Sequence, residues 1–269
     1  MRHMSRNMPA YLQIMSLWMQ TLYAYRFQVF IEMLALILKI FLFRVVWTAV
    51  YAGRSEVDGI ALAEVVSMTT LAHLQMYILN SNIPNYMRDK VRNGTIAIDL
   101  ARPVPFVGHM IADLLGSSVA ILPFIIVILP LVLVASGIQL PFSALAVAFY
   151  LLALLLAYVI NNLIGTLLGL MTFWMTEIWA IRSILIFVSQ FFSGAMVPLW
   201  FFPPLLRRLA DWLPFQSQAF LPISIYLGRI QGRAILEALG IQLFWIIMLT
   251  LIVVPIWRHA MRRVVIQGG

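Results

Sequence analysis

Long apolar segments separated by short polar ones dominate the order of hydrophobic and polar positions along this chain. A helix rises about 1.5 Å per residue, so about 20 consecutive apolar residues can cross a bilayer. Four segments each have the length of one such span: 27–50, 60–82, 110–136 and 236–257. A fifth run, 142–198, stays apolar for 57 positions and holds two spans, with a turn predicted at 174–182 around Glu177. The pattern predicts an all-α integral membrane protein with six transmembrane helices in a single domain, 1–269.

Two further segments do not fit a simple span. Within 9–25 the apolar residues recur at helical spacing and glutamines and a serine occupy another side, which predicts an N-terminal interfacial helix lying along the membrane. The alternative is that this segment extends the first span inward. The segment 199–236 contains several prolines, many aromatic residues and no span-length apolar run. It is predicted as a broken-helix outer segment, re-entrant in the membrane, before the last span.

Composition supports lipid as the main solvent of the chain. Of 269 residues, 63% are hydrophobic and only 10% are charged, whereas a soluble domain carries about 25% charged residues. The net charge of +8 suits cytoplasmic loops and anionic head groups, and no basic, aromatic-bearing soluble module predicts a nucleic-acid partner. The chain has no cysteine, which excludes disulfides and thiolate chemistry. No cleavable signal peptide is expected, because Gln13, Ser16 and Gln20 interrupt the first apolar stretch.

Basic residues predict the orientation. With six spans and the N-terminus inside, cytoplasmic segments hold eleven Lys and Arg residues and outer segments hold five. Because basic loops stay inside, both the N- and C-termini are predicted to be cytoplasmic. Asn93-Gly94-Thr95 fits a glycosylation sequon, but this topology places it in the cytoplasm, so it is not expected to be modified.

Four polar residues inside the spans are candidates for a transport site. Glu32 and Lys39 lie two turns apart on one face of the first span, too far apart to pair directly. Lys39 is near mid-span, where an ionisable residue is a functional candidate; the alternative is a lysine that pairs with a carboxylate of another helix or reaches water. Asn161 and Asn162 lie inside the fourth span.

Three other positions in the spans favour structural roles. His73 has no second metal ligand nearby in the sequence, so it is predicted to form a hydrogen bond inside the bundle rather than a metal site. Gly165 and Gly169 form a pair of small residues four positions apart, which permits close packing of helices.

The segment 84–105 is a compact charged element between two spans. Its charged residues are Arg88, Asp89, Lys90, Arg92, Asp99 and Arg102. Pro84 to Val91 is predicted to form a short helix that Asn93-Gly94 ends, and 95–101 can continue it. Such an element suits docking into a cleft of a soluble partner. The alternative is a solvated loop whose arginines only follow the positive-inside rule.

The chain resembles a permease subunit of an ABC transporter of the ABC-2 type. The residues that carry the resemblance are VRNGTIAIDLARP (91–103), LPFQSQAFLPISIYLGRIQG (213–232) and the closing VVIQGG. Members of the group have an RSGDIAYELLRP-like element in the first cytoplasmic loop, and Ala101 stands here where leucine is frequent. The similarity extends over essentially the whole chain.

In this family the loop after the second span carries a coupling helix that sits in a groove on a separate nucleotide-binding subunit. The resemblance therefore implies that 84–105 is the cytoplasmic coupling loop. It further implies a second, smaller contact at Glu177. The residues implied in ATPase coupling are Arg88, Asp89, Arg92, Gly94, Asp99, Arg102, Pro103 and Glu177.

The chain contains no Walker A pattern, so ATP and Mg²⁺ are expected to bind a partner ABC ATPase. No catalytic, cofactor or metal site is expected in this subunit, which is not expected to be an enzyme.

The resemblance implies an efflux function in a bacterial inner membrane. Two permease subunits, as a homodimer or a heterodimer, would export a drug, peptide, lipid or polysaccharide and contact membrane lipid. Two other classes stay open. Glu32, Lys39, Asn161 and Asn162 give slight support to a secondary transporter or channel. A membrane assembly factor without transport would explain the basic loop but not the broken outer segment.

Overall fold

The computed structural model describes residues 13, 16–18, 20–21, 24–96, 106–175 and 177–267. Five long helices dominate it: α3 (Arg26–Tyr51), α4 (Leu62–Ile78), α7 (Phe106–Ser136), α8 (Ala144–Leu170) and α12 (Arg233–Gln267). The shorter helices are α5 (Ile83–Arg92), α9 (Trp179–Phe192), α10 (Pro204–Asp211) and α11 (Phe220–Tyr226), with 3₁₀ turns η1 (Met171–Phe173), η2 (Leu199–Phe201) and η3 (Pro214–Gln218). The predicted helical fold class is confirmed.

A two-stranded hairpin joins α3 to α4. Strand β1 (Glu56–Val57) pairs antiparallel with β2 (Ile60–Ala61). Asp58 and Gly59 between them have φ of +52° and +75°, the left-handed pair that a tight hairpin of this twist requires. The sequence pattern predicted only that a short polar segment separates the spans 27–50 and 60–82.

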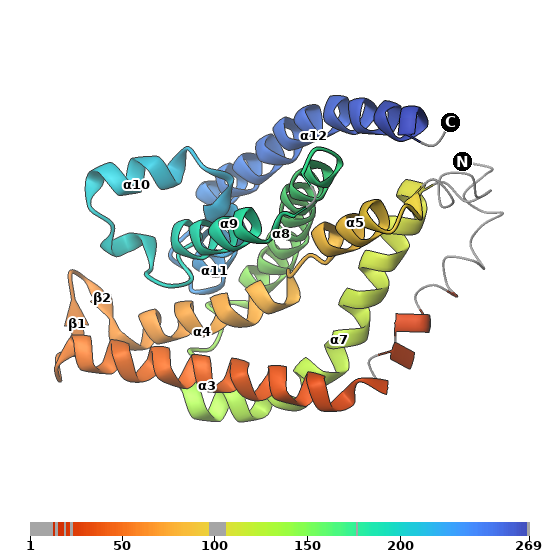
Figure 1. The fold of residues 1–269 in the computed structure, drawn as a ribbon. Coiled ribbons are helices and arrows are strands. Elements are labelled where there is room, and N and C mark those ends of the chain that lie inside the picture. The colour runs from red at the N-terminus through yellow and green to blue at the C-terminus, as the bar shows by residue number, and fades with distance from the viewer. Residues whose placement is uncertain are drawn as a thin grey trace.

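The connections between helices alternate between two ends of the molecule (Figure 1). At one end, Ser67 at the start of α4 accepts a hydrogen bond from the backbone N–H of Gln139, and Arg229 pairs with Glu64. We call this the hairpin end; it holds the connections 52–61, 137–143 and 193–232. At the other, Arg92 pairs with Glu177. This is the α5 end, with the connections 79–96 and 171–178, and the last turns of α12 lie on the same side.

Four helical segments of the described chain are long and apolar enough to cross a membrane: Leu62–Arg92, Gly108–Val134, Ala144–Phe173 and Arg233–Arg262. Helix α3 is not among them, although it is 26 residues long and its outer face exposes large apolar side chains such as Phe27 and Phe30. Helix α9 is shorter, with 14 residues. The predicted count of six spans therefore stays a prediction.

The turn between α8 and α9 is shorter than predicted. The sequence placed it at 174–182, but α9 already begins at Trp179, so Arg182 lies in the helix. Helix α9 also ends early, at Phe192, where Gly194 turns the chain with a φ of +80°.

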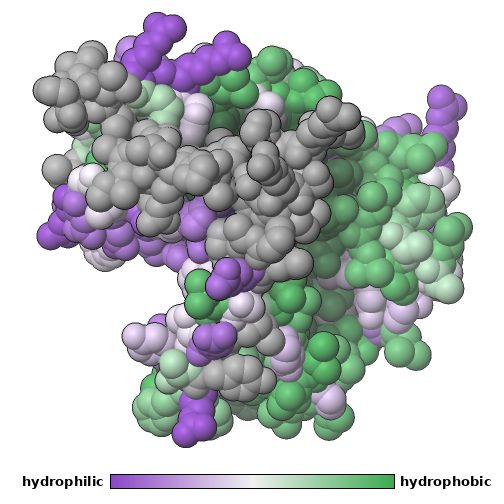
Figure 2. All heavy atoms as spheres, turned by 90° about the vertical axis from the view of Figure 1, so that its right-hand side faces the viewer, coloured by the Kyte–Doolittle hydropathy of each residue, from purple (hydrophilic) through white to green (hydrophobic). Residues whose placement is uncertain are grey.

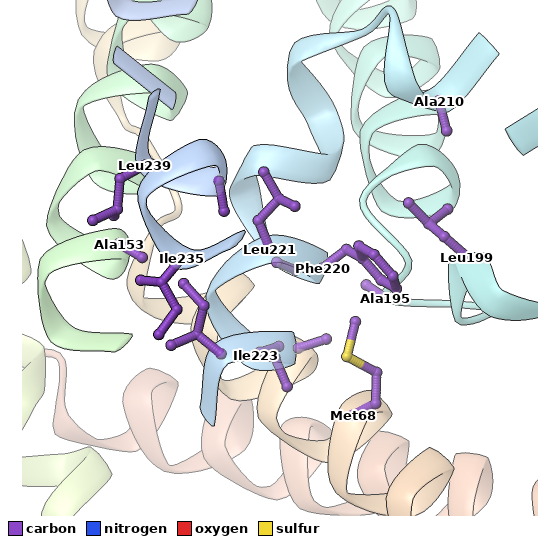
Figure 3. Close-up of a cluster of buried hydrophobic side chains, with 14 residues drawn as sticks. Met68, Ala153, Ala195, Leu199, Ala210, Phe220, Leu221, Ile223, Ile235 and Leu239 are labelled. Atoms are coloured by element: carbon purple, nitrogen blue, oxygen red, sulfur yellow. The ribbon is translucent and has the colours of Figure 1, made fainter. Parts of the chain in front are cut away.

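The broken segment supplies much of the core. Figure 3 shows Phe220, Leu221 and Ile223 of α11 pointing among side chains of α4, α8 and α12. The short helices between 199 and 230 match the prediction of broken helices, but the sequence did not indicate that η3 and α11 would be buried inside the bundle. Helix α10 is not buried in this way: its residue Leu205 is 71% exposed, and Trp212, directly after the helix, is 81% exposed. The outer, re-entrant position of the segment in a bilayer stays a prediction.

The predicted interfacial helix, 9–25, lies mostly outside the described residues. The described residues 13, 16–18, 20–21 and 24 are helical. Trp18 donates a hydrogen bond of 2.7 Å from its indole nitrogen to Asp113 of α7. This bond holds the described part of the segment against the bundle.

Candidate functional site

Helix α5 begins and ends where its sequence predicts. Pro84 stands in its first turn, where a missing N–H costs nothing. Asn93 follows the last helical residue, and Gly94 turns the chain with a φ of +69°. Ile83, Pro84 and Met87 are buried, whereas Asp89 and Arg92 are exposed. The helix therefore presents a charged face to solvent and fixes its apolar face to the bundle.

Two glycines of α8 allow α5 to pack at very short range. A Cβ added at Gly165 would lie 2.7 Å from Ser81 Oγ and 3.0 Å from Ser81 Cβ. A Cβ added at Gly169 would lie 2.7 Å from Met87 Sδ. Both distances are well inside van der Waals contact, so a larger residue at either position requires Ser81 or Met87 to shift. The predicted role of the glycine pair in close packing is confirmed.

The two connections at the α5 end are joined by charge. Arg92 Nη1 lies 3.3 Å from Glu177 Oε1, and both side chains are mostly exposed. Arg88 donates two hydrogen bonds to Asp89, at 3.0 and 2.9 Å. Exposed pairs stabilise a fold only slightly, so these charges present a polar surface more than they hold the structure together. Figure 2 looks onto this end and shows hydrophilic residues gathered beside a largely hydrophobic flank.

The structure thus brings Arg88, Asp89, Arg92 and Gly94 together with Glu177, although they lie far apart in the sequence. Asp99, Arg102 and Pro103 lie outside the described residues. Their assignment to the coupling loop stays a prediction.

A cavity of about 490 Å³ lies between α3, α4, α8 and α9. Three of the four polar residues singled out inside the spans line it: Glu32, Lys39 and Asn161. The fourth, Asn162, does not. Its amide donates a bond of 2.9 Å to Tyr158 O in its own helix, and its buried Oδ1 has no partner.

Glu32 and Lys39 have different partners in the cavity. Glu32 accepts hydrogen bonds from Gln28 at 3.0 Å and from the Tyr77 hydroxyl at 2.9 Å. Lys39 Nζ reaches Gln190 Oε1 of α9 at 3.5 Å, the long limit for a hydrogen bond. Within the described residues no carboxylate lies within ion-pair distance of Lys39, so the alternative of a carboxylate partner is not seen there.

A buried amide network forms the wall of the cavity nearest the core. Asn161 donates to Leu79 O and accepts from Gln218 Nε2 at 3.3 Å. Gln218 in turn accepts from the Ser189 hydroxyl at 2.5 Å. The network fixes α8, α9 and η3 around one side of the cavity.

Sequence reasoning missed the glutamines that hold η3 in place. Gln75 donates to Gln218 O at 2.6 Å, and Gln242 donates to Ser217 O at 2.9 Å and to Ala153 O at 3.0 Å. A short 3₁₀ turn leaves carbonyls free, and in an apolar interior they need donors. A glutamine within an apolar segment indicates a buried hydrogen bond. The acceptors of these glutamines are distant in the sequence, so the sequence alone does not identify them.

The N-terminal end of α5 reaches the cavity. Ser81 and Pro84 are part of its lining. Arg182, which also lines it, donates to Asn85 Oδ1 of α5 at 3.3 Å. A displacement of α5 would therefore change the shape and the polar lining of the cavity directly.

His73 forms the predicted hydrogen bond inside the bundle. Its Nδ1 lies 2.6 Å from Thr69 O, and its ring packs 4.5 Å from the ring of Phe43. Its buried Nε2 has no partner. Within the described residues no group of three or more His, Cys, Asp or Glu side chains could hold a metal ion.

Comparison with known protein families identifies a match over most of the chain. Residues 33–268 match the family model described as "ABC-2 family transporter protein". No curated protein matches the chain.

Proposed function

We propose that this chain, which belongs to the ABC-2 family of transporter proteins and is a membrane permease of an ABC transporter, couples ATP hydrolysis by a separate ATPase subunit to export of its substrate. The permease itself is a transport subunit and not the catalyst. ATP and Mg²⁺ bind the partner.

The observation that carries the proposal is the position of α5. Its charged face is exposed at one end of the molecule, and its buried face is held against α8 at Gly165 and Gly169. Pro84 in its first turn and Ser81 just before it line the cavity. A rigid helix that touches both solvent and cavity can transmit a push from outside because packed interfaces move as units.

The docking surface consists of the exposed face of α5 and the Glu177 turn, joined by the Arg92–Glu177 pair. We include in this docking surface the segment 97–105, which contains Asp99, Arg102 and Pro103. Closure of two ATPases on ATP would push the α5 elements of two permease subunits, identical or homologous, and rocking of the bundles would alternate access to the cavity.

The distribution of charge supports a cytoplasmic α5 end. Among the described residues this end holds Arg26, Arg88, Lys90, Arg92, Arg182, Arg258 and Arg262, whereas the hairpin end holds Arg54, Arg207, Arg208, Arg229 and Arg233. At each end two of these residues pair with carboxylates: Arg207 and Arg229 at the hairpin end, and Arg88 and Arg92 at the α5 end. Basic residues favour the cytoplasmic side. A tag added at Gly269 should be reachable only from the cytoplasm. Labelling of the tag from outside the cell would show that the proposed orientation is wrong.

Charge reversal at Asp99 and Arg102 together tests the docking surface. The variant should insert in the membrane normally but lose association with an ATPase encoded beside this gene. The matched control reverses Arg54 and Asp58 at the hairpin end, which should leave association intact. Normal ATPase association and transport by the Asp99/Arg102 variant would show that the docking proposal is wrong. The absence of any co-purifying ATPase would favour a secondary transporter, a channel or an assembly factor.

A further inference from the structure

The charges that line the cavity are unbalanced. Among the described residues that form its wall, Lys39 and Arg182 are cations and Glu32 is the one carboxylate. Glu32 already accepts two hydrogen bonds, from Gln28 and Tyr77. The carboxylate is therefore satisfied by neutral donors and is not the partner of Lys39.

The ammonium group of Lys39 has fewer hydrogen-bond acceptors than a partly buried charge requires. An ammonium carries three donors, and its hydrogen bond to Gln190 Oε1, at 3.5 Å, is long. A charge taken from water needs an opposite charge or several short hydrogen bonds. Gln190 uses its oxygen for Lys39, so its amide N–H groups are also left for a ligand. The unused donors of both side chains favour a ligand whose acceptor group carries negative charge.

His73 supplies a second, independent sign of a ligand. It lines the cavity, is only 4% exposed, and its Nε2 has no partner. Because a carbonyl only accepts, Nδ1 carries the proton donated to Thr69 O. Nε2 of the neutral ring is then a buried acceptor that lacks a hydrogen-bond partner.

The rest of the lining mixes polar and apolar side chains. Its polar members include Asn80, Ser81, Asn161, Ser189 and Gln218, and its apolar members include Leu36, Met76, Ile164, Leu168, Leu185 and Ile186. Glu32, Ala35 and Ile186 at the rim are exposed, so the cavity opens between α3 and α9. Its volume of about 490 Å³ lies in the range of pockets that hold one small ligand. One hydrocarbon chain fits beside an anionic head, whereas a lipid with two chains exceeds this space.

We infer that the cavity between α3, α4, α8 and α9 is a binding site for a single-chain anionic amphiphile, with Lys39 as the ion-pairing residue and Gln190 as a hydrogen-bond donor. This inference rests on the proposed transport function and names the chemical class of the substrate. Binding to the permease alone does not require an ATPase. Failure of the docking proposal and failure of this one can therefore be told apart.

The test uses the full chain in nanodiscs of phosphatidylcholine, with empty nanodiscs as background. Binding of dodecyl phosphate is compared with dodecyltrimethylammonium, which has the same chain and the opposite charge. The anion should bind and the cation should not displace it. Equal binding of the two, or no binding of the anion above the background, would overturn the assignment.

Variants then locate the site. Lys39→Met should weaken binding of dodecyl phosphate by about tenfold or more, because a hydrogen-bonded charge contributes at least that much, and Lys39→Arg should retain most of it. The control is Arg44→Met, which removes one positive charge from the same helix at a residue outside the cavity lining. Unchanged binding by Lys39→Met, or an equal loss with Arg44→Met, would contradict the site.

A two-chain phosphatidic acid in the same assay separates substrate from bilayer lipid. It should compete poorly with dodecyl phosphate. Competition as strong as that of dodecyl phosphate itself would overturn the single-chain assignment.

Discussion

Gly165→Ala is the sharpest perturbation of the contact between α5 and α8. The added methyl group would meet Ser81 Oγ at 2.7 Å and Ser81 Cβ at 3.0 Å. A serine has no long side chain that could swing away, so the backbone before α5 has to move. Gly240→Ala in α12 is the matched control, because a Cβ there meets nothing within 4 Å.

The magnitude follows from two opposing effects. Alanine in place of glycine stabilises a helix interior by about 1 kcal/mol, which applies to both variants. Overpacking costs about 1–3 kcal/mol and applies only to Gly165→Ala. We therefore expect the two variants to differ in free energy of unfolding by about 1–3 kcal/mol, with Gly165→Ala the less stable.

Thermal unfolding in a neutral detergent, followed by tryptophan fluorescence, measures the difference. At about 2–4 °C per kcal/mol for a chain of this order of size, Gly165→Ala should unfold about 2–12 °C below Gly240→Ala. Adding Ser81→Gly removes both clashing atoms and should recover most of the loss. Equal melting temperatures for the two glycine variants, or no recovery with Ser81→Gly, would refute the close-packing argument.

Two further predictions concern the hairpin end and the buried broken segment. Gln242→Leu leaves the carbonyl of Ser217 without its side-chain donor and removes a second donor from Ala153 O, which stays in the hydrogen-bond ladder of α8. The orphaned buried carbonyl costs about 1–3 kcal/mol, so the melting temperature should fall, and an unchanged value would show that the bonds contribute nothing. Arg229→Gln breaks the partly exposed ion pair with Glu64, which contributes about 0.2–1 kcal/mol to stability. It should therefore lower the melting temperature less than Gln242→Leu does. A larger drop for Arg229→Gln would show that the hydrogen bonds of Gln242 to η3 contribute less than the ion pair.

The sequence predicts the long helices well because hydropathy decides them. The predicted third span, 110–136, lies within α7 (Phe106–Ser136), and the stop at Asn93-Gly94 ends α5. Both depend on local properties: the length of an apolar run, and the ease with which glycine adopts a positive φ.

The buried position of η3 could not be predicted in this way. Gln216, Ser217 and Gln218 resemble a surface loop by composition, yet each is at most 3% exposed. Burial is possible because Gln75 of α4 donates to the carbonyl of Gln218 and Gln242 of α12 donates to that of Ser217. Such a pairing depends on how distant helices meet, which hydropathy does not contain.

The candidate site was predicted in part. The sequence singled out Lys39, Glu32 and Asn161 because polar groups in an apolar span are costly, and the structure brings these three to one cavity. It did not predict Gln190, 151 positions from Lys39, nor the link from α5 to the cavity through Ser81.

The central claim is that α5 docks an ATPase, and site-directed crosslinking tests it most directly. The chain has no cysteine, so Asp89→Cys, on the exposed face of α5, introduces a unique reactive thiol. A short thiol-to-amine crosslinker should join Asp89→Cys, in membranes, to the ATPase encoded beside the gene, whereas Arg54→Cys at the hairpin end should give no such product. A crosslink to the ATPase from Arg54→Cys but not from Asp89→Cys would contradict the account.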